Sequence, residues 1–343
     1  MQEDSKNIGP RFSVIIPLYN KAPYVRHALE SVFAQTYKDF ECIVVDDGST
    51  DGSLDIVRAI NEEMSRGKSL NEPLSLNDGR FKIFSQANAG VAAARNNGVA
   101  ASKGEYVCFL DADDWWEADF LEEMDKLIRE YPDAGLYATN YVYYKPGKTH
   151  VALKFKRGHM NYPEAYLQNE AMPVCTITVC MPRNVFDEMG GFPSGIKIGE
   201  DFLLWAKTAL HYSVAFCEKP LAYYNNDVPA HLRATRNLHA PQYHKLFNLD
   251  EIEFLVNARE SIVERETWKA LLDKHRVEEL MDYWLSEVYH DAAAEELKKV
   301  DWSKQPKKVK EQYEKPIWLL KARMQIMQIG SYCKQKILKI ITK

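Results

Sequence analysis

The stretch Tyr106-Val-Cys-Phe-Leu-Asp-Ala-Asp-Asp-Trp-Trp116 joins a short apolar run to three carboxylates in four residues. The apolar run predicts a buried strand over 106–110, and the apolar spacing from about Glu117 to Glu130 predicts a helix. A strand that ends in charged side chains and leads into a helix is typical of an α/β sheet, where ligands bind at the carboxyl ends of the strands. This stretch therefore predicts both a fold class and the place of a site.

The same order of strand and helix occurs three times before this stretch. Predicted strands cover 12–17, 40–45 and 80–84, and a predicted helix follows each of them, at 23–35, 53–64 and 90–101. Strands that alternate with helices predict a parallel sheet covered by helices on both faces. The middle third, about 134–230, is expected to contain short strands and short helices.

The composition is that of a globular protein whose partner is not a nucleic acid. The chain has 343 residues, which at roughly 150 residues per domain predicts about two domains. Lys and Arg number 44 and Asp and Glu 49, a net charge of −5, whereas a nucleic-acid-binding domain is usually basic. The six cysteines form no Cys-x-x-Cys pair, and the first residues carry no signal-peptide pattern. We therefore expect a cytoplasmic protein, and the lack of a long apolar run predicts that it does not span a membrane.

The turns after the predicted strands lack the common phosphate-binding motifs. Pro17-Leu-Tyr-Asn20 follows the first strand, where a dinucleotide-binding protein would have Gly-x-Gly-x-x-Gly. No Gly-x-x-x-x-Gly-Lys-Ser/Thr motif follows any strand, which disfavours a P-loop enzyme. A calcium loop that starts at Asp47 is excluded, because its twelfth position is Arg58 rather than a glutamate.

Polar side chains at the second and third strand ends each have two interpretations. Asp46 and Asp47 either accept hydrogen bonds from a nucleobase and a ribose, or form an Asp-Gly turn with a cap for the next helix. Arg95, in the helix after the third strand, either reaches a phosphate, whose oxygens match its guanidinium, or forms a surface ion pair. These residues alone do not decide between the two.

Carboxylates also mark the fourth strand end and a later helix start. Asp111, Asp113 and Asp114 repel one another unless a cation is near, and Mg²⁺ and Mn²⁺ prefer oxygen ligands that they share with substrate phosphates. Capping of the following helix would explain Asp114 but not all three. Glu200 and Asp201 open an apolar helical pattern, where an acidic pair either complements the helix dipole or supplies a reacting carboxylate.

Five segments, in this order, resemble family 2 of the inverting glycosyltransferases. They are Val14-Ile-Ile-Pro-Leu-Tyr-Asn20, Val45-Asp-Asp-Gly-Ser-Thr-Asp51, Asn88-Ala-Gly-Val-Ala-Ala-Ala-Arg-Asn96, Phe109-Leu-Asp-Ala-Asp-Asp114 and Gly199-Glu-Asp201. The resemblance covers about residues 11–225 and implies the GT-A fold of nucleotide-diphospho-sugar transferases. That fold is a doubly wound mixed α/β sheet in which a nucleotide-binding half joins an acceptor-binding half. The Gln-x-x-Arg-Trp motif of the processive polymerases is absent, so a non-processive enzyme is expected.

The resemblance also implies a role for each matching residue. Tyr19 would stack on the nucleobase, Asp46 or Asp47 would accept from the uracil ring N–H, and Arg95 would lie near the diphosphate. The implied nucleotide-binding set is Pro17, Tyr19, Asn20, Asp46, Asp47, Arg95, Asp111, Ala112 and Asp113. The implied metal ligands are Asp113 and Asp111, the implied base is Asp201, and the second-tier candidates are Glu200, Asp114, His231 and Arg233.

The implied reaction moves a sugar from a UDP-sugar to a hydroxyl of a glycan or a lipid-linked glycan. The leaving diphosphate needs a cation, Mn²⁺ or Mg²⁺, and the attacking hydroxyl needs a base on the opposite face of the sugar. A single displacement of this kind inverts the anomeric carbon. Two other classes remain: a sugar-phosphate nucleotidyltransferase, which normally has a Gly-rich loop after the first strand, and an inactive sugar-nucleotide-binding relative, which would be expected to have lost Asp113 or Asp201.

The predicted domains differ in character. We expect a catalytic domain over 1–238, with a nucleotide-binding half at about 11–115 and an acceptor half at about 116–238, and a helical extension over 239–343. The segment 315–343 contains seven basic residues and no acidic one, among apolar residues at helical spacing. It predicts either an amphipathic helix on the anionic inner face of a membrane or a helix packed on the protein with a solvated basic face.

Overall fold

The computed structural model describes residues 9–65, 79–169, 171–229 and 238–321. The chain divides into two compact units, Met1–Ser261 and Ile262–Lys343. Residues 239–261, which the sequence grouped with the extension, belong to the first unit. There a β-bridge joins Ile198 to His244, and helix α8 (Asp250–Asn257) packs on helix α7 (Glu200–His211).

The first unit is built on one mixed sheet, which confirms the expected α/β class. Its strand order is β3-β2-β1-β4-β9-β6-β10-β5, and β7 and β8 pair with β6 and β10. The first four strands are parallel and agree with the predicted ones: β1 (Phe12–Leu18), β2 (Phe40–Asp46), β3 (Phe81–Ser85) and β4 (Tyr106–Phe109). Strand β9 (Val179–Pro182) runs antiparallel to β4 and begins the second half of the sheet.

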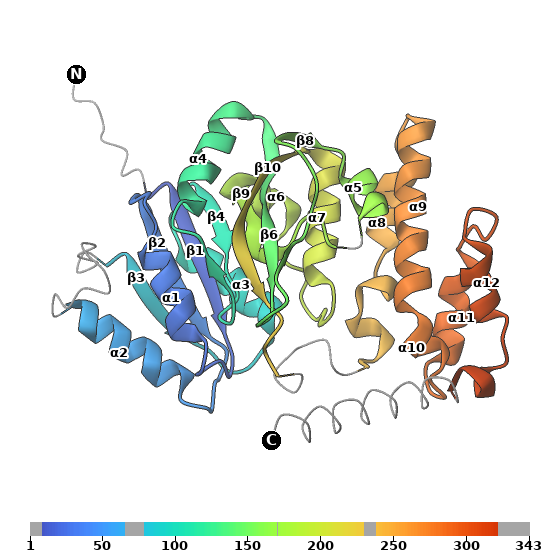
Figure 1. Ribbon diagram of the computed structural model, residues 1–343, viewed down its shortest axis with the longest axis horizontal. Helices are drawn as coiled ribbons and strands as arrows, with labels where there is room; N and C mark the ends of the chain where they lie inside the picture. Colours follow the sequence, from blue (N-terminus) through green and yellow to red (C-terminus); the bar gives the residue numbers. More distant parts are fainter. Residues whose placement is uncertain (1–8, 66–78, 170, 230–237, 322–343) are drawn as a thin grey trace. The chain divides into compact units, whose positions relative to one another are not determined.

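Helices cover both faces of the sheet (Figure 1). They are α1 (Val25–Phe33), α2 (Ser53–Ser65), α3 (Val91–Ala101), α4 (Phe120–Glu130), α5 (Tyr162–Gln168) and α6 (Arg183–Met189), besides α7 and α8. Since crossovers between parallel strands are right-handed, the strand order places α1 and α2 on one face and α3 on the other. The direction of winding reverses at β1, and in such sheets a ligand site lies at the carboxyl edge next to the reversal.

The second half of the sheet differs from the short strands that the sequence suggested. Strands β6 (Ala134–Tyr144) and β10 (Ser213–Asn225) are long and parallel to each other, and β10 continues through irregular register near Pro220. The remaining strands are short: β5 (Trp115–Trp116), β7 (His150–Val151) and β8 (Gly158–Met160). Bulges let one strand carry a bend without ending, and this is why turn residues such as Pro220 did not mark a strand end.

An aromatic cluster in the core links the two halves below the carboxyl edge. Phe109 of β4 meets Phe192 with ring centroids 5.1 Å apart, and Phe192 meets Trp205 of α7 at 5.5 Å. All three side chains are buried. Edge-to-face aromatic packing of this kind is worth about 1 kcal/mol per pair beyond the buried area. The cluster therefore fixes the start of α7 against the end of β4.

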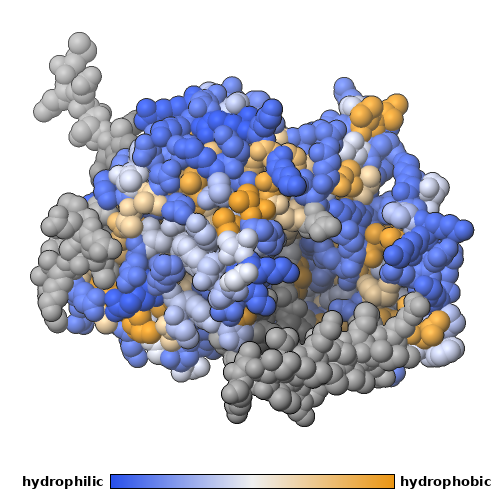
Figure 2. Space-filling view, in the orientation of Figure 1, coloured by the Kyte–Doolittle hydropathy of each residue, from blue (hydrophilic) through white to orange (hydrophobic). Residues whose placement is uncertain are grey.

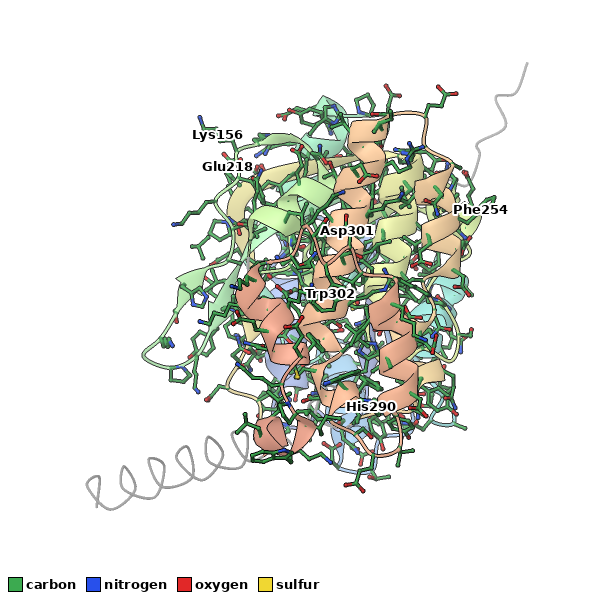
Figure 3. All side chains as sticks on the ribbon, turned by 90° about the vertical axis from the view of Figure 1, so that its right-hand side faces the viewer. Lys156, Glu218, Phe254, His290, Asp301 and Trp302 are labelled. Atoms are coloured by element: carbon green, nitrogen blue, oxygen red, sulfur yellow. The ribbon has the colours of Figure 1, made fainter. Side chains whose placement is uncertain are left out.

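The second unit is helical. It contains α9 (Ile262–Glu279), α10 (Met281–Trp284), α11 (His290–Lys298) and α12 (Lys307–Tyr313). Buried Arg276 of α9 donates to Glu296 of α11 at 3.1 Å, and the backbone N–H of Asp301, labelled in Figure 3, donates to Asp273 at 3.0 Å.

The face of the protein shown in Figure 2 is mostly hydrophilic, with hydrophobic residues scattered among the polar ones. Figure 3 labels one exposed apolar residue, Phe254 of α8. Across the described residues, none of the helices combines the length and the apolar character that crossing a membrane requires.

Candidate functional site

The loops after β1 and β2 are tied together at the carboxyl edge of the sheet. Asn20 has a φ of 51°, a left-handed conformation that asparagine adopts more readily than most residues. Its backbone N–H donates to Ser49 Oγ at 3.1 Å, and its Oδ1 accepts from the Thr50 N–H at 2.8 Å. Asn20 thus holds its own loop against the next one. Beside it, Tyr19 is 48% exposed, whereas Pro17 is buried within β1.

The paired carboxylates after β2 are buried and largely used by the protein itself. Asp47 Oδ1 accepts from Gln86 Nε2 and from the Ala89 N–H, both at 2.8 Å, and its Oδ2 accepts from the Gly90 N–H at 2.9 Å. Asp46 accepts one backbone N–H, from within its own turn, at 3.1 Å. Asp46 and Asp47 are each 3% exposed. Asp47 therefore holds the loop between β3 and α3, and Asp46 makes fewer hydrogen bonds to the protein.

The Asp-Gly turn that the sequence offered as the second interpretation is present. Gly48 has a φ of +77°, which favours glycine. Asp51 accepts from the backbone N–H of Ser53, the first residue of α2, at 3.0 Å. Gly48 and Asp51 therefore have structural roles in this segment.

The carboxylates after β4 point in different directions. Asp113 Oδ2 accepts from Lys21 Nζ, in the loop after β1, at 2.5 Å. Asp114 accepts from the backbone N–H of Asn225, at the end of β10, at 2.7 Å. We call Asp111–Asp114 the acidic loop. Asp114 connects this loop to the second half of the sheet and does not cap α4. Ala112, between the acidic residues, is buried.

Burial and mutual repulsion disfavour the charged forms of Asp113 and Asp114. Burial raises the pKa of Asp113 and raises that of Asp114 well above its usual range, and the charge of Asp111 adds to both effects. In the described part of the chain, no group of three or more His, Cys, Asp or Glu side chains could hold a metal ion by itself. Mg²⁺ and related cations are usually held by one or two carboxylates together with substrate phosphates. The donor set of Asp113 and Asp111 therefore fits a cation that is shared with a diphosphate.

Arg95 joins the two halves of the sheet. Its Nη2 donates to Asp111 Oδ1 at 2.7 Å, and its Nη1 donates to Glu200 Oε1 at 2.8 Å. The guanidinium also lies 5.1 Å from the ring centroid of Phe192, and the side chain is only 4% exposed. Arg95 therefore forms ion pairs, as one of the two interpretations predicted. These ion pairs are buried and do not lie on the surface. One side chain spans from the acidic loop to the start of α7.

Asp201 follows Glu200 in the first turn of α7 and is held at both oxygens. Thr176, in the 3₁₀ turn Thr176–Thr178, donates through Oγ1 to Asp201 Oδ2 at 2.8 Å. The Phe202 N–H donates to Asp201 Oδ1 at 2.8 Å. Burial and the charge of Asp201 raise the pKa of Glu200 to about 7, against the opposing effect of Arg95. The helix start therefore presents one carboxylate with a fixed orientation and one that is paired with Arg95.

The structure brings most of the expected site residues to one edge of the sheet. Two of them, His231 and Arg233, lie outside the described residues. Sequence reasoning missed Lys21 and Thr176. The position of Lys21, directly after the Pro17-Leu-Tyr-Asn20 turn, was a usable signal, whereas Thr176 carries no motif.

Comparisons with known proteins identify the family of this chain. Residues 13–190 match the family described as "Glycosyl transferase family 2". "Glycosyltransferase GlyA" of Streptococcus pneumoniae is 40% identical over 134 residues, which are 39% of this chain and 17% of that protein. An "Uncharacterized glycosyltransferase" of Rickettsia felis is 33% identical over 214 residues, 62% of this chain and 32% of that protein. The aligned part thus spans a third or less of these relatives.

A solved structure shares the fold. The crystal structure of S. aureus TarS 1–349 in complex with UDP-GlcNAc matches with a TM-score of 0.67 at 20% identity. The match covers 87% of this chain and 82% of that one. Together with the family match, it confirms the expected GT-A fold with a helical C-terminal region.

Proposed function

The chain belongs to glycosyl transferase family 2, and from that premise we propose that it is an inverting, non-processive glycosyltransferase. It moves a sugar from a UDP-sugar to a hydroxyl of a glycan or a lipid-linked glycan. Asp201 is the base, and Asp113, with Asp111 beside it, holds a divalent cation.

The observation that carries this proposal is the Arg95 bridge. Its two hydrogen bonds, at 2.7 Å to Asp111 and 2.8 Å to Glu200, connect the end of β4 to the start of α7. A transfer reaction needs a carboxylate for the acceptor proton within a sugar's width of the group that holds the leaving diphosphate. Because Asp201 is next to Glu200, the bridge connects the segment that carries the proposed base to the segment after β4 that carries the proposed metal ligands.

The chemistry then divides between the two halves. When bound at Asp113, Mn²⁺ or Mg²⁺ stabilises the charge that develops on the leaving diphosphate. Asp201 accepts the proton of the acceptor hydroxyl as its oxygen attacks the anomeric carbon from the face opposite the diphosphate. Thr176 and the Phe202 N–H hold the Asp201 carboxylate in orientation for that transfer. The single displacement inverts the anomeric carbon.

UDP-sugars are the first donors to test. TarS, which shares the fold, binds UDP-GlcNAc. In this chain the exposed ring of Tyr19 stands at the strand ends where a base would stack, and Asp46 makes one hydrogen bond to the protein. We therefore assign base recognition to Tyr19 and Asp46 rather than to Asp47.

The segment 315–343 contacts the inner face of the membrane, where a lipid-linked acceptor would be anchored. Trp318 is 71% exposed within the part of this segment that the structure describes, and residues 322–343 lie outside it. Liposome flotation of the full chain and of a chain that ends at residue 314, on anionic vesicles, tests this contact. Equal flotation of the two would contradict it.

A donor screen tests the function itself. Hydrolysis of UDP-, GDP- and ADP-sugars is measured with Mn²⁺ and with a chelator, and we expect UDP release that needs the metal. With the preferred donor and an oligosaccharide acceptor, NMR of the anomeric proton reports the product configuration. A product that keeps the donor's anomeric configuration would contradict single displacement. If none of the donors releases its nucleoside diphosphate in a metal-dependent way, the transferase assignment is contradicted.

A further inference from the structure

Lys21 occupies a position at the acidic loop that no motif assigns. Its Nζ lies 2.5 Å from Asp113 Oδ2, and the two side chains are 16% and 18% exposed. The neighbouring carboxylates have other partners, because Asp111 pairs with Arg95 and Asp114 accepts a backbone N–H. Among the described residues, Lys21 is thus the cationic side chain that pairs with Asp113.

The backbone around Lys21 is fixed, whereas its side chain is long. Three successive N–H groups of this loop donate to the segment after β2: Asn20 to Ser49 Oγ at 3.1 Å, Lys21 to Ser53 Oγ at 2.8 Å and Ala22 to Asp51 Oδ2 at 2.9 Å. A lysine carries its charge on a flexible four-carbon stem. The ammonium can therefore change partner while the loop that carries it stays in place.

The same Asp113 oxygen cannot serve both cations equally well. Divalent cations of this kind bind carboxylate oxygens at roughly 2.1 Å, and Lys21 Nζ already lies 2.5 Å from Oδ2. A cation on the same oxygen would therefore lie within roughly 5 Å of the ammonium, and the two like charges repel each other. A diphosphate brings the negative charge that can accept the ammonium.

We propose that Lys21 is a donor-binding residue that changes partner. It neutralises Asp113 in the empty enzyme and moves to the diphosphate when the nucleotide arrives, which frees Asp113 for the divalent cation. Nucleotide and cation consequently bind with positive coupling. This inference rests on the proposed function, since it takes the donor to be a nucleoside diphosphate sugar.

The test measures Mn²⁺ binding rather than turnover. Free Mn²⁺ is followed by electron paramagnetic resonance in titrations of the full chain, with and without UDP. For the wild type we expect UDP to tighten Mn²⁺ binding by at least about 10-fold, within the usual range of coupling between two sites. For K21M we expect Mn²⁺ alone to bind about 10-fold more tightly than in the wild type, and UDP to change that affinity by less than about 3-fold.

Two further variants separate the role of Lys21 from a general loss of an ion pair. Lys21→Arg keeps the charge and is expected to retain the coupling. Lys82→Met removes a partly buried ion pair of Lys82 with Glu41, at 2.7 Å, away from the site, and is expected to leave the coupling as in the wild type. If K21M is unstable by thermal unfolding, Lys21→Gln, which keeps a hydrogen-bond donor, replaces it.

The outcomes are distinguishable. Wild-type coupling that K21M retains would overturn the role of Lys21 and leave the transferase proposal intact. A wild type that binds no UDP with or without Mn²⁺ would overturn the proposed function, and the role of Lys21 with it.

Discussion

The ends of β2 and β4 carry similar acidic sequences with opposite surroundings. After β2, Asp47 accepts three hydrogen bonds from Gln86, Ala89 and Gly90, so its carboxylate is committed to holding a loop. After β4, Asp113 pairs with the ammonium of Lys21, which we propose changes partner when the nucleotide binds. The comparison suggests a rule: a carboxylate at a strand end can bind a ligand when its partner in the protein is a side chain that can move to another group. The predictions below test this difference, together with the Arg95 bridge that carries it to Asp201.

The largest effect is expected for Asp201→Asn. The amide keeps the shape but cannot accept the acceptor's proton, and loss of a general base lowers turnover by about 10²–10⁴-fold. UDP binding with Mn²⁺ should change by less than about 3-fold, because the amide alters no donor contact. Steady-state transfer rates and calorimetric UDP binding check this prediction.

Asp55→Asn is the matched control for Asp201→Asn. Asp55 also lies in the first turn of a helix, α2, but its side chain is 83% exposed. This control should retain wild-type turnover. Near-wild-type turnover of Asp201→Asn would show that another group is the base.

The next effect concerns the bridge between the halves. Arg95→Met leaves Asp111 and Glu200 without their shared cation, and breaking a buried ion pair costs about 3–5 kcal/mol. Urea unfolding measures the loss. Arg129→Met, which removes an ion pair of a side chain that is 73% exposed, should cost less than about 1 kcal/mol. Equal losses for both variants would mean that the bridge does not hold the halves together.

A smaller loss of stability is expected for Asp47→Asn. One carboxylate oxygen becomes an amide nitrogen that faces a backbone N–H donor, and an unsatisfied buried donor costs about 1–3 kcal/mol. Urea unfolding should show this loss, while Mn²⁺-dependent UDP binding persists. Unchanged stability would indicate that the β3–α3 loop does not depend on Asp47.

A further effect on stability is a pH dependence from Glu200, which appears only over a limited pH range. Because its pKa in the folded protein is raised from 4.5 to about 7, the folded state holds a proton that the unfolded state has released between those values. The stability that Glu200 contributes is therefore full below pH 4.5 and is lost as the pH rises through about 7. Relative to Glu200→Gln, the wild type should lose on the order of 3 kcal/mol of unfolding free energy across this window. If the unfolding free energies of the two proteins change with pH in parallel, the raised pKa of Glu200 is contradicted.

Much of the nucleotide-binding half could be predicted from the sequence. The strand and helix ranges up to Glu130 follow from apolar periodicity, and the carboxylates after the fourth strand could be found because they follow that strand directly. These signals are local. The long strands β6 and β10 were not predicted, because their bulges and turn residues interrupt the pattern.

The connections within the site could not be predicted, because they join distant residues. Arg95 reaches Glu200 across 105 positions, and Thr176 reaches Asp201 across 25. No spacing rule relates such pairs, and only the packing of α7 on the sheet brings them together. The placement of Arg95 near the diphosphate stays a prediction, and the structure adds that its guanidinium contacts two carboxylates.

The most direct test of the comparison is a pair of measurements on Asp113→Asn and Asp47→Asn: thermal unfolding, and UDP binding with and without Mn²⁺. We predict that Asp113→Asn keeps its melting temperature and loses the Mn²⁺ dependence of UDP binding, whereas Asp47→Asn melts earlier and keeps that dependence. The reverse pattern, Mn²⁺-dependent binding retained in Asp113→Asn and lost in Asp47→Asn, would contradict the assignment of the cation to the end of β4.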